Sequence, residues 1–83
     1  MNNVSLDGKV VQATLLNGRW TIYLRVRDEK GLIDTLKVKT SLPNLFFEVG
    51  DRVTLSGPLR SRGGQCFVEI TADHNVCVSL SER

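Results

Sequence analysis

Cationic side chains and one aromatic residue share a face of the segment Arg19–Arg27. Its odd-numbered positions are Arg19, Thr21, Tyr23, Arg25 and Arg27, and its even-numbered positions are Trp20, Ile22, Leu24 and Val26. Side chains two positions apart on an extended strand point to the same face. Guanidinium groups bind phosphates, and aromatic faces stack on unpaired bases. The polar face is therefore chemically suited to a single-stranded nucleic acid.

Two other segments add cations to this face. Lys37 and Lys39 point outward if Leu36 and Val38 point inward, and a Gly-rich basic turn follows near residue 60. Seven of the eleven Lys and Arg residues fall in this set, whereas the net charge of +2 would not by itself indicate nucleic acid. The candidate binding residues are Arg19, Tyr23, Arg25, Arg27, Lys37, Lys39, Arg60, Arg62 and Phe67.

Alternatives remain for several of these residues. The Lys and Arg side chains could instead cover a solvated face and keep the protein soluble. Phe67 could be a second stacking platform, or it could lie at the barrel bottom or cover the barrel edge. Trp20 has the parity of the aliphatic residues, which favours the core, and Phe46 and Phe47 are expected to plug a barrel end.

The sequence favours no catalytic or metal site. His74 with Cys66 and Cys77 falls short of the four ligands of a tetrahedral site. Asp28 and Asp51 stand in turn positions, where Asp bonds nearby backbone N–H groups. No Ser-His-Asp or Cys-His arrangement is evident, and no phosphate-binding Gly loop precedes a helix. We therefore expect a protein that is not an enzyme and has no cofactor and no small-molecule substrate.

Short apolar segments between regular turn signals must position the polar face. Such spacing is typical of a β-sandwich or barrel. Broken alternation in the first segment predicts a bulge, and Asn17-Gly18 predicts a tight hairpin. The expected strands are Leu6–Leu16, Arg19–Arg27, Ile33–Thr40, Asp51–Leu59 and Gln65–Thr71, with a short helix or irregular plug at Ser41–Val49 and an edge segment at Val76–Leu80.

Three local patterns in this order resemble the oligonucleotide/oligosaccharide-binding (OB) family, in its anticodon-binding and single-stranded-DNA-binding branch. Leu6–Val10 (LDGKV) is similar to the family's opening h-x-G-x-V. Tyr23–Gly31 (YLRVRDEKG) is similar to F-h-x-L-x-D-x-x-G, in which the aromatic residue commonly stacks on a base. Val49–Gly57 (VGDRVTLSG) is similar to h-G-D-x-V-x-V-x-G and is followed by a Gly-bearing turn and Phe67–Ile70. The very short Asn17-Gly18 loop and the lack of an extended acidic tail depart from the family pattern.

The resemblance implies an all-β, five-stranded Greek-key OB barrel. We expect one domain over residues 1–83, with the barrel core at about 6–72 and the edge segment at 76–80. The implied function is binding of single-stranded nucleic acid, with DNA favoured over RNA, accessory to replication, recombination or a mobile element. The alternative is a protein-interaction module that acts as a small subunit of a larger assembly.

Partners and location follow from the same features. Replication or recombination proteins are expected partners, and the tail edge offers a surface for a homodimer. The N-terminus has neither the basic start nor the apolar stretch of a signal peptide, and no apolar run is long enough to span a bilayer. Two cysteines eleven positions apart do not form a disulfide framework. These features lead us to expect a cytoplasmic protein without a membrane partner.

Overall fold

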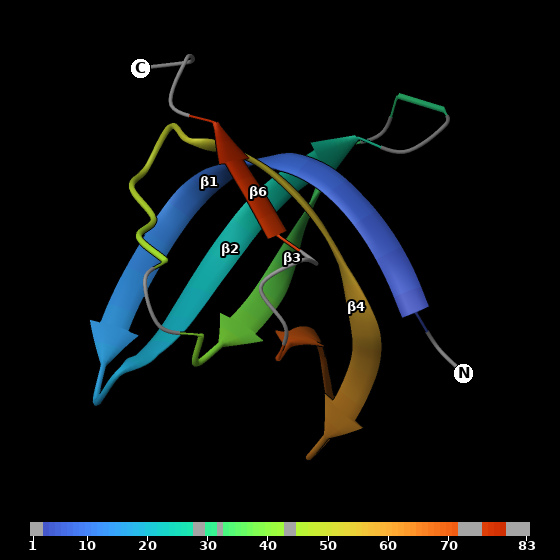
Figure 1. Cartoon of the computed structure of the whole chain (residues 1–83). Coiled ribbons are helices and arrows are strands. Elements are labelled where there is room, and N and C mark those ends of the chain that lie inside the picture. Colours follow the sequence, from blue (N-terminus) through green and yellow to red (C-terminus); the bar gives the residue numbers. More distant parts are fainter. Residues whose placement is uncertain (1–2, 28–29, 32, 43–44, 72–75, 80–83) are drawn as a thin grey trace.

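Every regular element in the described part of the chain is a strand (Figure 1). The computed structural model describes residues 3–27, 30–31, 33–42, 45–71 and 76–79. The strands are β1 (Asn3–Leu16), β2 (Arg19–Arg27), β3 (Ile33–Thr40), β4 (Arg52–Arg62), β5 (Gln65–Ile70) and β6 (Val76–Ser79). Within those ranges there is no helix that is long and apolar enough to cross a membrane.

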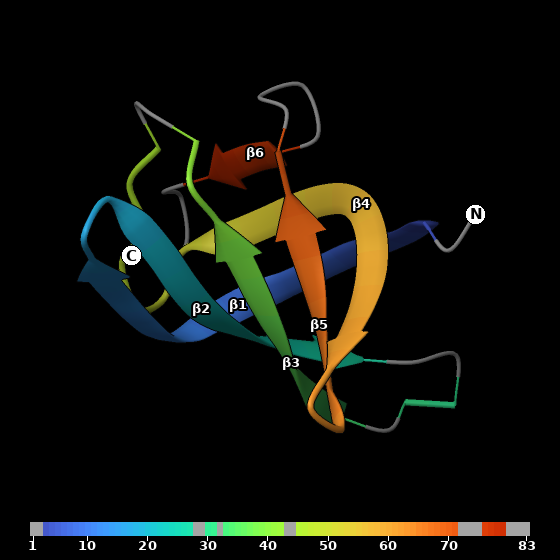
Figure 2. The ribbon, with the colours of Figure 1, turned by 90° about the horizontal axis from the view of Figure 1, so that it is seen from below.

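Five strands close into a ring. The order is β1-β2-β3-β5-β4, and β4 pairs back with β1. All pairs in the ring are antiparallel except β3–β5, whose two strands run side by side in the same direction (Figure 2). Both β1 and β4 curve strongly, so that each contributes to two sides of the ring (Figure 1). The expected five-stranded barrel is confirmed, and β6 extends it by pairing with β4.

The predicted bulge and hairpin turn are both present. The β1–β2 register shifts between Val10 and Gln12, so the inward positions of β1 change from even-numbered, as at Val10, to odd-numbered, as at Ala13. Asn17 and Gly18 have φ values of 53° and 74°, as a two-residue turn between twisted strands requires. The bulge bends β1, and so it pairs with β4 over Asn3–Lys9 and with β2 over Gly8–Leu16.

The inward face of β2 forms the middle of the core. Ile22 and Leu24 are fully buried, and Trp20 is buried at one end of the barrel. The Trp20 indole Nε1–H donates a hydrogen bond to the Leu45 carbonyl oxygen at 3.2 Å. Its ring also meets Phe47 edge-on, with 5.3 Å between centroids. The expected core position of Trp20 is confirmed, and the outward parity of the cationic positions follows from it.

The segment between β3 and β4 is an irregular plug. Of the two expected forms, a short helix or an irregular plug, its described residues, 41–42 and 45–50, take the irregular form. Phe47 fills the barrel end, whereas Phe46, expected to do the same, is 65% exposed. The Asp51 carboxylate accepts the Glu48 N–H at 2.9 Å, and the Val10 N–H donates to the Asp51 carbonyl oxygen at 2.9 Å. Together with the bond from the Gly50 N–H to the Val10 carbonyl oxygen, the Val10–Asp51 bond ties the end of the segment to β1.

Some element boundaries differ from the expected ones. Strand β1 starts at Asn3, and β4 continues to Arg62 because Arg60–Arg62 pair with β5. The expected basic turn is therefore reduced to Gly63 and Gly64, with φ values of 59° and 80°. Cys66 has the same parity as the buried Val68 and Ile70, but it is exposed near this turn. Three residues named in the sequence analysis lie outside the described ranges, namely Asp28, His74 and Leu80.

Candidate nucleic-acid interface

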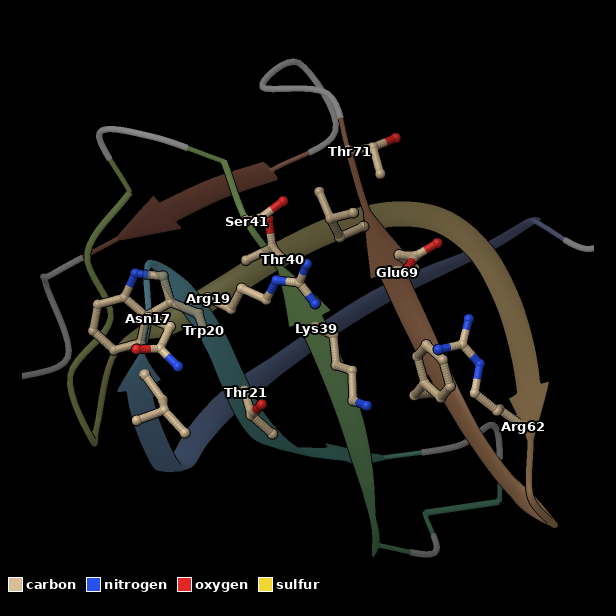
Figure 3. A pocket seen from close by; sticks show the side chains of 13 residues that line it. Asn17, Arg19, Trp20, Thr21, Lys39, Thr40, Ser41, Arg62, Glu69 and Thr71 are labelled. Carbon is tan, nitrogen blue, oxygen red and sulfur yellow. The ribbon is translucent and has the colours of Figure 1, made fainter.

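An open cleft of about 630 Å³ lies over the outer face of β2, β3 and β5 (Figure 3). Its walls carry more polar than apolar side chains, and they come from segments far apart in the sequence. They are Leu16, Asn17, Arg19, Trp20, Thr21, Lys39, Thr40, Ser41, Arg62, Phe67, Glu69, Ile70 and Thr71. Of the predicted binding residues, the structure brings Arg19, Lys39, Arg62 and Phe67 together here.

Three cations reach this cleft from three strands. Arg19 and Lys39 project from β2 and β3 into its middle, and Arg62 stands across from Trp20 and Asn17 (Figure 3). Alternation in β2 and β3 explains the first two, since their inward neighbours are buried in the core. Arg62 lies in the cleft because β4 continues to the Gly63-Gly64 turn. The arrangement offers guanidinium and ammonium donors to a polyanion that lies along the cleft.

Phe67 has the expected outward parity but is not open to solvent. Its neighbour Val68 belongs to the core cluster, whereas Phe67 does not, although it is only 4% exposed. The Lys39 ammonium lies 4.6 Å from its ring centroid, a cation–π distance. In this conformation Lys39 covers the ring, so its burial matches the edge-covering alternative, and stacking on it would require Lys39 to move.

Glu69 brings a carboxylate to the same cleft and was not among the candidates. It is the register partner of Lys39 on β3, and its Oε1 lies 3.4 Å from Arg60 Nε. Arg60 therefore lies beside the cleft in an ion pair and does not line it. Glu69 lies two positions from Phe67 and therefore has the same outward parity, which is the signal that could have identified it. Thr40 and Ser41, also missed, end β3 and have no comparable signal.

Tyr23 lies outside the cleft lining, farther along the outer face of β2. It is half-buried and stands opposite Gln12 on β1 and Lys37 on β3. The strand places Tyr23 between Thr21, which lines the cleft, and Arg25. Tyr23 and Lys37 thus form the floor next to the cleft.

Arg25 and Arg27 line a separate hollow of about 180 Å³. Its other walls are Asp7, Gly8, Lys9 and Arg52. Lys9 and Arg52 were missed, although each directly precedes an inward valine, Val10 or Val53, and so has outward parity. The candidate set is therefore divided between two places and does not share one groove.

An ion pair ties β1 to β4 at this hollow. Arg52 Nε and Nη2 donate to the two Asp7 carboxylate oxygens at 3.2 Å each. These hydrogen bonds to Arg52 are the main reason that the pKa of Asp7 lies below its ordinary value of 3.8. The Asp7 carboxylate is therefore ionised at neutral pH and orients the Arg52 guanidinium.

The comparisons with known proteins show the fold. No protein-family model matches the chain, and no curated protein matches it. Among solved structures, it is similar to the dimeric structure of the N-terminal domain of PriB protein from Thermoanaerobacter tencongensis. The two share 28% sequence identity with a TM-score of 0.66, over 93% of this chain and 94% of that chain. Together with the strand order, this likeness confirms the OB fold, which hosts binding of oligonucleotides and oligosaccharides.

Proposed function

We propose that this chain is a non-catalytic cytoplasmic protein that binds single-stranded nucleic acid, DNA in preference to RNA, and acts in replication, recombination or a mobile element. The observation that carries the proposal is the cleft itself. It gathers Arg19, Lys39 and Arg62 over β2 and β3, and OB folds bind oligonucleotides at the corresponding face. The likeness to the PriB N-terminal domain supports the fold-level part of the proposal.

The residues in and beside the cleft then have the following roles. Arg19, Lys39 and Arg62 hold backbone phosphates in the cleft, and Lys37 holds one beside it. Tyr23 stacks on a base, a contact worth about 1–3 kcal/mol. A carboxylate such as Glu69 accepts hydrogen bonds from exocyclic amino groups of bases, and it repels phosphates that lie too deep in the cleft. The basic cleft and the stacking floor together favour unpaired strands over duplexes.

The test is a titration of labelled oligo-dT, a matched RNA and a matched duplex at two salt concentrations. We expect a preference for single strands, with log K falling against log salt at a slope of about −3 if four phosphates are contacted. Tyr23→Ala should weaken binding by about 5- to 150-fold, which corresponds to the loss of one stacked base. Tyr23→Phe, the matched control, retains the ring and should bind nearly as well as the parent. A wild-type protein that does not bind single-stranded oligonucleotides at low salt would contradict the proposal.

The second candidate function is a protein-interaction module, and two exposed apolar residues favour it. Phe46 and Val49 are 65% and 62% exposed on the plug segment. Large apolar side chains that gather on one surface mark interaction sites. If oligonucleotides fail to bind, the test is capture of a purified replication or recombination protein by this chain. Phe46→Ser and Val49→Ser should abolish that capture if this surface is the interface.

We also propose that the chain forms a homodimer. The similar PriB domain is described as dimeric. From Val11 to Leu16, β1 pairs with β2 only, and no other described strand covers its second edge. Leu15 and Leu16 are exposed there, and an unpaired edge with apolar side chains is prone to pair with another chain. The tail edge β6, expected from the sequence, is the competing surface.

A further inference from the structure

A second cationic hollow lies at the other end of β2 from the cleft. Four cations and one carboxylate line it, namely Lys9, Arg25, Arg27, Arg52 and Asp7. In the sheet register, Lys9 on β1 stands opposite Arg25 on β2 and also opposite Arg52 on β4. Three cations therefore form one row across three neighbouring strands, and Arg27 stands one step along the same face of β2.

Such a row places like charges on neighbouring strands. Like charges directly opposite one another on neighbouring strands destabilise a sheet. Asp7 is the carboxylate of this lining, and it forms an ion pair with one of the four cations, Arg52. A phosphate bound between the strands would reduce this repulsion and accept hydrogen bonds from the cations.

The hollow and the cleft are connected by the outer face of β2. Arg19 begins that face in the cleft, Tyr23 stands midway, and Arg25 and Arg27 end it in the hollow. Eight residue steps of an extended strand span about 26 Å. Because the midpoint carries an aromatic ring, a single strand that leaves the cleft crosses a stacking surface before it reaches the second group of cations.

We propose that this hollow is a second phosphate clamp, which holds the backbone of a single strand after it has left the cleft and passed Tyr23. The clamp rests on the proposed function, since it needs a strand already bound in the cleft. Lys9 and Arg25 contact the phosphodiester, and Arg27 contacts the backbone of the nucleic acid where it leaves the hollow. Asp7 keeps the Arg52 guanidinium oriented. The binding site then extends around the barrel onto β1 and β4.

The test uses oligonucleotide length as the readout. An oligo-dT of about 4 nucleotides fills the cleft alone, and one of about 12 nucleotides also reaches the hollow, both within the range of site sizes of OB folds. Lys9→Gln should weaken binding of the long oligonucleotide by about tenfold and reduce its salt slope by about 0.7, the value for one phosphate contact on a single strand. Binding of the short oligonucleotide should not change. Lys9 is exposed, so this variant should fold like the parent.

Two further variants of this chain test whether the loss of binding is specific to the hollow. Lys30→Gln removes an exposed cation that lines neither the cleft nor the hollow, and it should leave both lengths unaffected. Arg27→Gln should reproduce the length-dependent loss. If Lys9→Gln weakens binding of both oligonucleotides equally, or of neither, the proposal of a second clamp is wrong. If it weakens neither, the row of cations would instead bind another class of anion, such as an acidic protein segment. A wild type that binds neither length contradicts the proposed function itself.

Discussion

At the scale of single residues, the Asp7–Arg52 pair makes a prediction about pH. Bonds from Arg52 lower the pKa of Asp7 in the folded state, so ionised Asp7 stabilises the fold above the unfolded pKa of about 3.9. This contribution is lost as the pH falls through the folded pKa. Because both side chains are about half exposed, Asp7→Asn should lower the free energy of unfolding by only about 0.5 kcal/mol at pH 7. Urea unfolding of both proteins at pH 7 and pH 2 measures it. A difference that persists at pH 2 would assign the effect to packing.

The direction of a side chain could be predicted residue by residue, but its neighbours could not. Alternation alone placed Trp20 in the core and Tyr23 outside it. It could not show that Lys39 lies over Phe67, because that contact joins β3 to β5. Nor could it show that β2 runs from the cleft to the hollow, so that Arg19 and Arg25 line different sites. Such contacts depend on the twist and closure of the barrel, which local periodicity does not encode.

At the scale of elements, two glycines act by different physical mechanisms. A Cβ on Gly8 would lie 2.7 Å from the Arg25 carbonyl oxygen and 2.8 Å from Val26 Cγ1, whereas a Cβ on Gly18 meets nothing within 4 Å. Gly8→Ala should therefore destabilise the fold by about 1–3 kcal/mol through crowding between β1 and β2. Gly18→Ala should cost roughly 1 kcal/mol, because its φ of 74° strains an L-residue.

Asparagine substitutions separate these two mechanisms, and thermal unfolding measures them. Gly18→Asn should restore most of the stability lost in Gly18→Ala, because Asn tolerates a positive φ. Gly8→Asn should be at least as unstable as Gly8→Ala, because the larger side chain increases the crowding. Equal rescue at both positions would show that the close approach of β1 and β2 at Gly8 is not the reason for glycine there.

Strands were predictable from the sequence where a turn bounded them on both sides. Asn17-Gly18 and the alternation of residues 19–27 gave the bounds of β2 as the structure has them. The plug segment was misread in part, because the spacing of Leu42, Leu45, Phe46 and Val49 suits a helix. Long-range bonds decide its path instead, since residues 50 and 51 pair with Val10 on β1. An interaction across forty residues leaves no trace in local spacing.

At the scale of the whole molecule, the unpaired part of the β1 edge predicts the oligomeric state. Leu15 and Leu16 are 52% and 67% exposed there, and two copies that pair along this edge would bury them and join their sheets. Light scattering at high concentration should give twice the monomer mass of 9.2 kDa. Leu15→Lys should return the protein to a monomer, because a charged side chain on an edge opposes pairing. Cys77→Lys, which changes an exposed residue of β6, should leave the dimer intact. If Cys77→Lys dissociates the dimer and Leu15→Lys does not, the tail edge is the interface, and a wild-type monomer would rule out both.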